Sequence, residues 1–163
     1  MEQICRVLFL SRRDTARSPM AEVILNKKGA GRFEAVSAGV EPPGQIDPGA
    51  LEVMNRGGYE TADLRPKHVS ELASTAFDFV FTLSDTAKEE DLPQWPGQPI
   101  SAHWHCPDPL ASQGDAAERA LAYAQILGGL ERRIQAFVSL PMEALDRVSL
   151  QARVDSIGDS PQP

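Results

Sequence analysis

The stretch VLFLSRRDTARSPMAE, residues 7–22, decides the fold of this chain. Its first four residues are apolar and predict a strand buried on both faces, as in a parallel sheet. A polar loop follows, and then Pro19, which suits the first turn of a helix. Met20, Val23 and Ile24 would share one face of that helix. The stretch therefore predicts a strand, a short polar loop and a helix in succession.

The alternation of strands and helices continues along the chain. We predict strands at 4–10, 32–40, 77–83 and 99–104, and helices at 19–31, 47–58, 69–76, 114–138 and 141–157. This order favours an α/β fold, a three-layer sandwich whose parallel sheet is flanked by helices. We expect a single domain over 1–140, with the C-terminal amphipathic helix 141–157 packed on it and a tail over 158–163.

Composition narrows the possible partners. The chain has 163 residues and a net charge of −7. The phosphates of nucleic acids and anionic membranes would repel it, so we expect no nucleic acid and no membrane as a partner. Cys5 and Cys106 are too few for a secreted disulfide framework, and we expect Cys5 to be buried in the first strand. No signal-peptide pattern is visible at residues 1–14, so we expect a cytoplasmic location.

Ligands of parallel sheets bind beyond the carboxyl ends of the strands, and the polar segments 11–18, 82–85 and 103–109 fall there. The loop 11–18 can direct several backbone N–H groups at one point, and the helix dipole adds positive charge. Arg17 would bind two oxygens of an anion, and Ser18 is placed to cap the helix. The alternative is an ordinary turn between a strand and a capped helix.

The loop resembles that of the low-molecular-weight protein tyrosine phosphatase superfamily, in particular its bacterial arsenate reductase branch. Those proteins have VLFLCTGNSARSxxAE where this chain has VLFLSRRDTARSPMAE, and Asp108–Pro109 matches their distant Asp-Pro pair. The segments GRFEAVSAG, FDFVFTLSD, WPGQPISAHWHCPDP and LDRVSLQARVDSIG are similar as well. The resemblance implies a four-stranded parallel sheet flanked by helices. It also implies catalytic roles for three positions: nucleophile at Ser11, oxyanion clamp at Arg17 and general acid at Asp108.

The cysteines that the resemblance implies are absent. Serine stands at the nucleophile position, Ser11, and at the first relay position, Ser84. The second relay position falls at Leu92, or at Asp91 in a shorter-spaced variant. A serine hydroxyl is far less acidic than a thiol, and serine cannot supply the two electrons that reduce arsenate. We therefore expect a pseudo-enzyme without thioredoxin coupling. An engineered change would explain Ser11 alone, so the further differences favour natural divergence.

The remaining loop residues favour binding without a cofactor. Arg13 stands where the family has glycine, so we expect the backbone there to be strained or altered, and Asp14 adds negative charge. Glu22 and Ser37 match positions that support the loop and, in some reductases, a potassium ion, so a cation site is an alternative. We expect phosphate, sulfate, arsenate or a phosphorylated ligand to bind the loop residues Ser11, Arg12, Arg13, Asp14, Thr15, Ala16, Arg17 and Ser18.

The segment HWHCPDP contains three kinds of metal-binding side chain. Imidazole, thiolate and carboxylate ligands could come from His103, His105, Cys106 and Asp108. Their spacing matches no closed zinc pattern, so we predict no metal here. We expect His103 to pack at the end of a strand and His105 to be solvated. Cys106 could alternatively act as a nucleophile beside the anion site.

Three functions remain open from the sequence. The leading one is a pseudo-enzyme that binds an oxyanion or a phosphorylated partner without turnover, because Arg17 is present and the nucleophile is not. The second is a weak phosphomonoesterase that uses Ser11, water or Cys106, with Asp108 as general acid. The third is a non-catalytic interaction protein linked to arsenic response.

Overall fold

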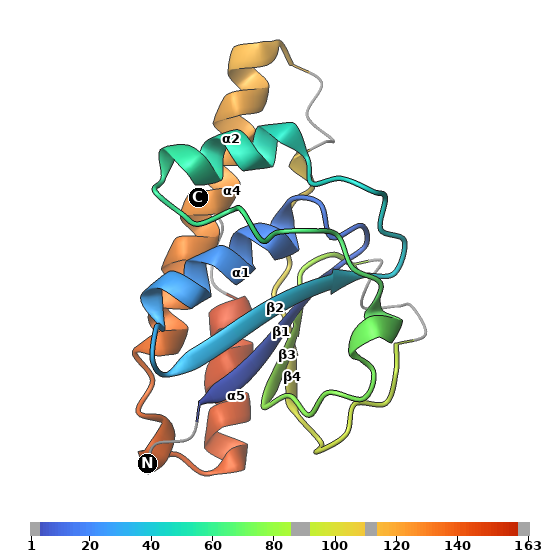
Figure 1. Cartoon of the computed structure of the whole chain (residues 1–163). Helices are drawn as coiled ribbons and strands as arrows, with labels where there is room; N and C mark the ends of the chain where they lie inside the picture. The colour runs from blue at the N-terminus through green and yellow to red at the C-terminus, as the bar shows by residue number, and fades with distance from the viewer. Residues whose placement is uncertain (1–3, 86–91, 110–113, 160–163) are drawn as a thin grey trace.

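The computed structural model describes residues 4–85, 92–109 and 114–159. Within these residues, parallel strands form one four-stranded sheet in the order β2-β1-β3-β4 (Figure 1). The predicted strands are confirmed, although the last two are shorter than predicted. Their bounds are β1 (Cys5–Ser11), β2 (Phe33–Gly39), β3 (Phe79–Thr82) and β4 (Ile100–His103).

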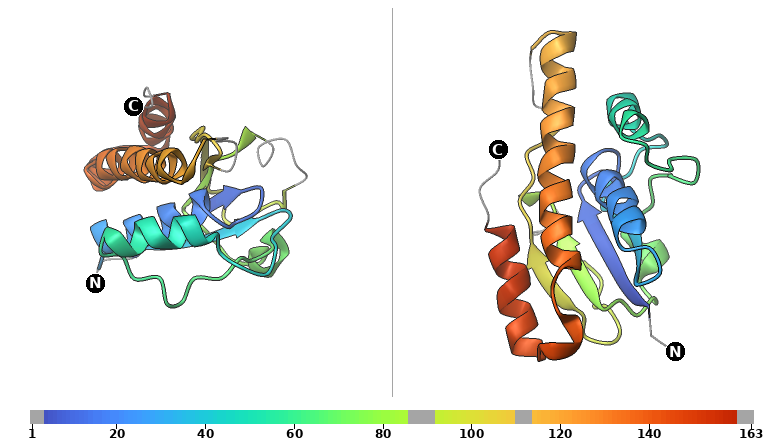
Figure 2. Two further views of the ribbon diagram at one scale, coloured as in Figure 1. Left: turned by 90° about the horizontal axis from the view of Figure 1, so that it is seen from above. Right: turned by 90° about the vertical axis from the view of Figure 1, so that its left-hand side faces the viewer.

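In the described part of the chain, four α-helices flank the sheet: α1 (Arg17–Lys28), α2 (Pro48–Arg56), α4 (Ala116–Val138) and α5 (Arg147–Gly158). α1 contacts β1 and β2, α5 contacts β4, and α4 contacts α1, α2 and α5. Figure 2 shows α4 and α5 running side by side. Two short 3-10 helices, η1 (Val69–Leu72) and η3 (Met142–Ala144), complete the described elements. The α/β fold class is confirmed.

The two faces of the sheet carry separate apolar clusters. Val7 and Phe9 belong to the cluster that also contains buried residues of α1, α2, α4 and α5. Leu8 and Leu10 point to the opposite face and pack with Val69 of η1. Neighbouring residues of a strand point to opposite faces, so burial on both sides explains the unbroken apolar run of β1.

The C-terminal helix α5 packs on the end of β4. Trp104, which follows β4, stacks on Phe81 with ring centroids 4.0 Å apart. Its indole N–H donates to the carbonyl of Val154 in α5 over 2.9 Å. Gly158 permits this close approach, because a Cβ there would lie 2.6 Å from Trp104 Cδ1. Among the described helices, none is both long enough and apolar enough to cross a membrane.

Side-chain caps change the bounds of two predicted helices. α5 begins after Asp146, whose carboxylate accepts a hydrogen bond from the N–H of Ser149 over 2.7 Å. The helix predicted over 141–157 is therefore wrong before residue 147. The helix predicted over 69–76 is only the 3-10 turn η1, which His68 caps. Residues 160–163 of the predicted tail lie outside the described residues.

Candidate functional site

The loop 11–18 joins the carboxyl end of β1 to the first turn of α1. β1 lies between β2 and β3, so the loop occupies an inner position at this edge of the sheet. Gly39, at the end of β2, allows the loop to pass close by, because a Cβ there would lie 2.9 Å from Arg12 O and Asp14 N. The carbonyl of Arg12 accepts from the N–H of Val40 over 2.9 Å. The backbone of the loop is therefore fixed against the end of β2.

Several backbone N–H groups of the loop have no acceptor among the described residues. No hydrogen bond of the described part of the chain uses the N–H of Arg13, Thr15, Ala16, Arg17 or Ser18 as its donor. These groups precede or form the first turn of α1, where the helix dipole is positive. Such a set of N–H groups at a helix N-terminus is chemically suited to an anion.

Three side chains of the loop form a chain of hydrogen bonds. Ser18 Oγ donates to Asp14 Oδ1 over 2.8 Å and lies 2.5 Å from Ser11 Oγ. A hydroxyl has one proton, so Ser18 accepts from the hydroxyl of Ser11. Ser11 Oγ in turn accepts from the backbone N–H of Asp14 over 3.2 Å. Ser11 is 2% exposed, so its hydroxyl is held at the base of the loop.

One expectation for this loop is wrong, and the strain that was one possibility at Arg13 is not observed. Ser18 does not cap α1: the N-cap is Ala16, without a side-chain cap bond, because the hydroxyl of Ser18 is engaged by Ser11 and Asp14. Arg13 is not the left-handed residue of the loop either. The positive φ, 56°, belongs to Asp14. Aspartate adopts this conformation more readily than most residues, because its short polar side chain can bond locally.

Asp14 is buried, and each of its two carboxylate oxygens accepts a hydrogen bond. Oδ1 accepts from Ser18, and Oδ2 accepts from the backbone N–H of Lys67 over 2.9 Å. Burial raises the pKa of Asp14 to about 6, although hydrogen bonds from Ser37, Lys67 and Ser18 and the charge of Lys67 oppose the rise. The negative charge that the sequence places in the loop is therefore partly neutralised just below neutral pH.

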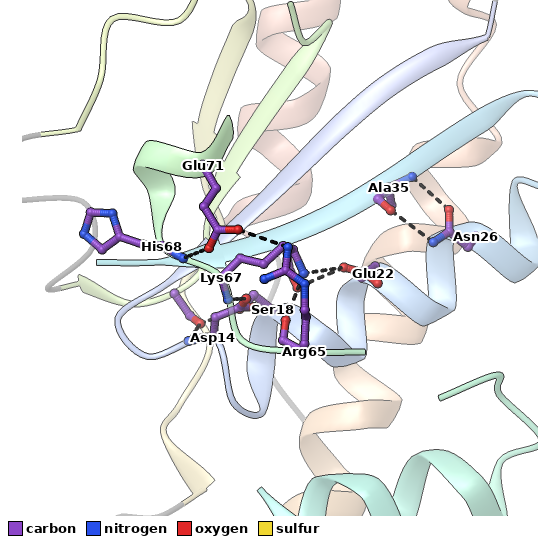
Figure 3. A network of polar contacts seen from close by, with 11 residues as sticks. Asp14, Ser18, Glu22, Asn26, Ala35, Arg65, Lys67, His68 and Glu71 are labelled. Carbon is purple, nitrogen blue, oxygen red and sulfur yellow. Dashed lines mark hydrogen bonds and ion pairs between the residues drawn. The ribbon is translucent and has the colours of Figure 1, made fainter. Parts of the chain in front are cut away.

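Glu22 and Ser37, the two residues predicted to support the loop 11–18, are hydrogen-bonded to each other. Ser37 Oγ donates to Glu22 Oε1 over 3.0 Å, and Lys67 Nζ lies 3.9 Å from the same oxygen (Figure 3). The side chains of Lys67 and Glu22 are 12% and 14% exposed. Burial raises the pKa of Glu22, and the ammonium of Lys67 opposes the rise. The cation beside Glu22 is thus a side chain of the protein itself, where the sequence left open a bound ion.

The arginines of the loop have different surroundings. Arg12 pairs with Glu41 at the surface, with Nη2 2.8 Å from Oε1. Such exposed pairs contribute little to stability. Arg13 is exposed. Arg17 is half-buried, and its Nη1 donates to the carbonyl of Cys106 over 3.1 Å. Arg17 therefore links the loop to the segment that carries Asp108.

The two cysteines are poorly placed for chemistry in the loop. Cys106 is 2% exposed, and burial raises the pKa of its thiol to about 11 despite the nearby Arg17 and Arg133. This environment argues against Cys106 as a nucleophile. Cys5, expected to be buried, is only half-buried, at the opposite end of β1 from the loop. Burial nevertheless raises its pKa to about 11. Asp108 is exposed, and its charge lies close enough to Cys106 to raise the pKa of the Cys106 thiol further.

The remaining predicted positions lie after β3 and β4. Ser84 is buried, and Leu92 packs against the apolar cluster that includes Leu8, Leu10 and Val69 of η1. The alternative relay position, Asp91, lies outside the described residues. His103 and His105 come together around Asp85, which sequence reasoning missed because it lies 18 and 20 positions from them.

Comparison with known proteins gives a consistent result. The family of low molecular weight phosphotyrosine protein phosphatases matches residues 6–151. The arsenate reductase of Shouchella clausii is 30% identical over 132 residues, which cover 80% of this chain and 93% of that protein. The arsenate reductase structure from Archaeoglobus fulgidus has a TM-score of 0.66 at 28% identity, covering 82% of this chain and 99% of the other. The low molecular weight protein tyrosine phosphatase of T. tengcongensis has a TM-score of 0.68 at 26% identity, covering 86% and 99%. The chain therefore belongs to the low molecular weight phosphotyrosine protein phosphatase family.

Proposed function

We propose that this chain binds an oxyanion, such as phosphate, sulfate or arsenate, in the loop 11–18 and does not carry out the catalysis of its family. One observation carries the proposal. The backbone N–H groups of the loop and of the first turn of α1 have no acceptor among the described residues, and Ser11 stands in this loop where the resemblance implies the nucleophilic cysteine.

The local charge supports an anion although the chain as a whole is acidic. Arg12, Arg13 and Arg17 bring three guanidinium groups to the loop, and the first turn of α1 adds the positive end of its dipole. Asp14 is the acidic residue of the loop. Its carboxylate is already bound by Ser18 and a backbone N–H, and its pKa of about 6 leaves it partly neutral in mildly acidic solution.

The sulfur chemistry of arsenate reduction has no support in this chain. Reduction of arsenate needs a thiolate that attacks and further thiols that accept the oxidation. The thiols present are those of Cys5 and Cys106, and burial raises the pKa of each to about 11. A thiol with this pKa is protonated at neutral pH and is a poor nucleophile. We infer that the name of the relative from Shouchella clausii does not describe the activity of this chain.

Thermal unfolding with added arsenate, phosphate or sulfate, at matched ionic strength, tests the binding proposal. A ligand at about a hundredfold its Kd should add about 2.7 kcal/mol to the free energy of unfolding. Arg17→Ala should remove most of this stabilisation. Sulfate and phosphate also stabilise proteins without binding a site, so the Arg17-dependent part is the relevant quantity. Arg56→Ala is the matched control, because Arg56 is exposed and pairs only over one helical turn with Glu52.

The outcomes separate the two interpretations of the loop. Stabilisation that Arg17→Ala removes and Arg56→Ala retains supports an anion site. If every anion stabilised all three proteins equally, the ions would be acting through their exclusion from the protein surface and not by binding a site. The proposal would then fail. The direct check is titration calorimetry with phosphate, in which the wild type should bind one ion per chain.

A weak phosphomonoesterase is the second candidate, because Ser11 is linked to a carboxylate. A proton that leaves Ser11 can pass to Ser18 while the proton of Ser18 passes to Asp14. Ser11 Oγ would form the bond to phosphorus as the ester oxygen leaves with a proton from Asp108. Water would then hydrolyse the phosphoserine, which releases phosphate and restores Ser11. Asp14, with a pKa of about 6, is a weak base for a serine hydroxyl, so any turnover would be slow.

Hydrolysis of p-nitrophenyl phosphate distinguishes this candidate from simple binding. Activity that disappears in both Ser11→Ala and Asp14→Asn would support it. A rate that is the same in wild type and Ser11→Ala, each purified in the same way, would show that Ser11 is not the nucleophile. In that case the second candidate is excluded, while anion binding remains to be judged by the titration.

A further inference from the structure

Two histidines and an aspartate converge at the carboxyl ends of β3 and β4. His103 Nε2 lies 2.8 Å, and His105 Nδ1 lies 3.1 Å, from the same oxygen, Asp85 Oδ1. The three candidate ligand atoms lie within 4.8 Å of one another. Ligand atoms around a tetrahedral Zn²⁺ stand about 3.3 Å apart, because each metal–ligand bond is about 2.0–2.1 Å. The cluster is therefore close to the spacing that one metal ion requires.

Partners outside the cluster hold both histidines in place. Thr82 Oγ1 lies 2.8 Å from His103 Nδ1, so the other ring nitrogen of His103 is directed at Asp85. Arg133 donates to the carbonyl of His105 over 2.6 Å and fixes the backbone there. Histidines that bind metals commonly have such a partner on their second ring nitrogen, which orients the ring.

Alternating side-chain directions in the extended segment that ends β4 and continues past His103 explain why the cluster includes His103 and His105 but not Cys106. Trp104, between the two histidines, points into the core and is fully buried. The thiol of Cys106 belongs to the same core cluster as Trp104. The side chains of the cluster remain open to water, with exposed fractions of 19% for His103, 55% for His105 and 67% for Asp85. A metal ion can therefore reach the three ligand atoms from solution.

We propose that Asp85, His103 and His105 bind one Zn²⁺ ion or a similar divalent transition metal, with a position left for water. Two imidazole nitrogens and one carboxylate suit such an ion better than Mg²⁺ or Ca²⁺, which prefer oxygen ligands throughout. The ion would join the segment after β3 to the end of β4. Neither the ligand set nor its test depends on anion binding by the loop 11–18.

The test is calorimetric titration of the full chain, without a histidine tag, with zinc chloride. The wild type should bind one ion per chain. Asp85→Asn and His105→Ala should each lower the affinity more than tenfold, and Thr82→Val should lower it about tenfold by releasing the His103 ring. His68→Ala is the matched control, because it removes the third histidine of the chain, which caps η1 elsewhere. This control should bind as the wild type does.

Spectra of the protein titrated with Co²⁺ identify the ligands independently. We expect ligand-field bands of a nitrogen and oxygen site that persist in Cys106→Ala. Absence of zinc binding by the wild type would overturn the proposal, as would unchanged affinity in both Asp85→Asn and His105→Ala. A thiolate-to-cobalt charge-transfer band that vanishes in Cys106→Ala would also overturn it, because the ligand set would then be different. Asp85 and His105 are exposed, so these variants should fold, and circular dichroism checks that they do.

Discussion

The backbone N–H of Lys67 donates to Asp14 Oδ2 over 2.9 Å, so a residue 53 positions away holds the left-handed turn of the loop 11–18. The side chain of the same lysine lies beside Glu22 of α1. One residue thus supports the loop twice, through its backbone and through its charge.

Asp14→Asn should change how stability depends on pH. The pKa of Asp14 is about 6 in the folded protein, against an ordinary value of 3.8. Between these two values the folded state binds more protons than the unfolded state, so stability falls as pH rises. At neutral pH the ionised, buried carboxylate costs up to about 3 kcal/mol. The free energy of unfolding of the wild type, relative to Asp14→Asn, should therefore fall from about pH 4 to about pH 7.

Asparagine suits this position because its amide can keep both partners. Its oxygen can accept from Lys67 N–H, and its NH₂ can donate to Ser18 if the hydroxyl of Ser18 turns to Ser11. The measurement is urea unfolding of both proteins over this pH range. A constant difference between them would contradict the raised pKa of Asp14.

Lys67→Met should destabilise the protein at neutral pH by about 1–3 kcal/mol, because Glu22 would lose its cation while remaining largely buried. The loss should shrink in acid, since a protonated Glu22 needs no positive partner. Lys28→Met is the control, because Lys28 is exposed and its ammonium donates to Gln135 at the surface. Urea unfolding in potassium chloride and in choline chloride should show that potassium restores part of the stability of Lys67→Met. Equal stability of the two lysine variants at neutral pH would mean that the Lys67–Glu22 pair contributes nothing to the free energy of unfolding.

Ser11→Cys should give the protein measurable phosphatase activity. A thiol at the base of the loop would lie at the N-terminus of α1 near Arg17, and such surroundings lower the pKa of a thiol. The assay is p-nitrophenyl phosphate hydrolysis, supported by the pH dependence of alkylation of the introduced thiol. Ser84→Cys is the control, because it places a thiol at another buried position after a strand. Arsenate reduction should stay absent from both variants, because each of them restores only one of the three cysteine positions that the resemblance implies.

Activity of Ser11→Cys should fall again when Asp108→Ala is added, if Asp108 protonates the leaving group. A folded Ser11→Cys protein without turnover would show that the RRD sequence at 12–14 has altered the loop beyond the loss of the nucleophile. The proposal that Ser11 accounts for inactivity would then be wrong.

Gly39→Ala should weaken both the fold and the loop. The added Cβ would lie 2.9 Å from backbone atoms of Arg12, Arg13 and Asp14, which cannot turn aside as a long side chain could. We expect a loss of about 1–3 kcal/mol in the free energy of unfolding. Anion-induced stabilisation should also decrease. Gly44→Ala is the control, since a Cβ at Gly44 meets nothing within 4 Å. Thermal unfolding of the two variants checks the difference.

The sequence predicted the elements that depend on local pattern. The apolar run before Ser11 and the helix that begins near Pro19 appear as β1 and α1, because both are encoded by neighbouring residues. Burial on both faces of β1 was also predictable. Helix bounds were less so, because single side chains such as Asp146 decide where a helix begins.

Contacts between distant segments could not be predicted from one sequence. Ser18 suits a helix cap in isolation, but in the fold its hydroxyl meets Asp14 and Ser11. Nothing in the sequence around Lys67 indicates that it reaches Asp14 and Glu22. Asp85 likewise approaches His103 only because β3 and β4 are neighbours in the sheet. In each case the missing information is the packing of one segment on another.

Arg17 and Arg133 hold the carbonyls of two adjacent residues, Cys106 and His105. An anion that draws the guanidinium of Arg17 into the loop would remove one of these two anchors from the segment that carries His105. Binding of an anion at Arg17 would then change the free energy of metal binding at His105. Such coupling is reciprocal, so each ligand would alter the affinity of the other by the same factor. Anion binding by the loop 11–18 and metal binding by Asp85, His103 and His105 would then be thermodynamically linked.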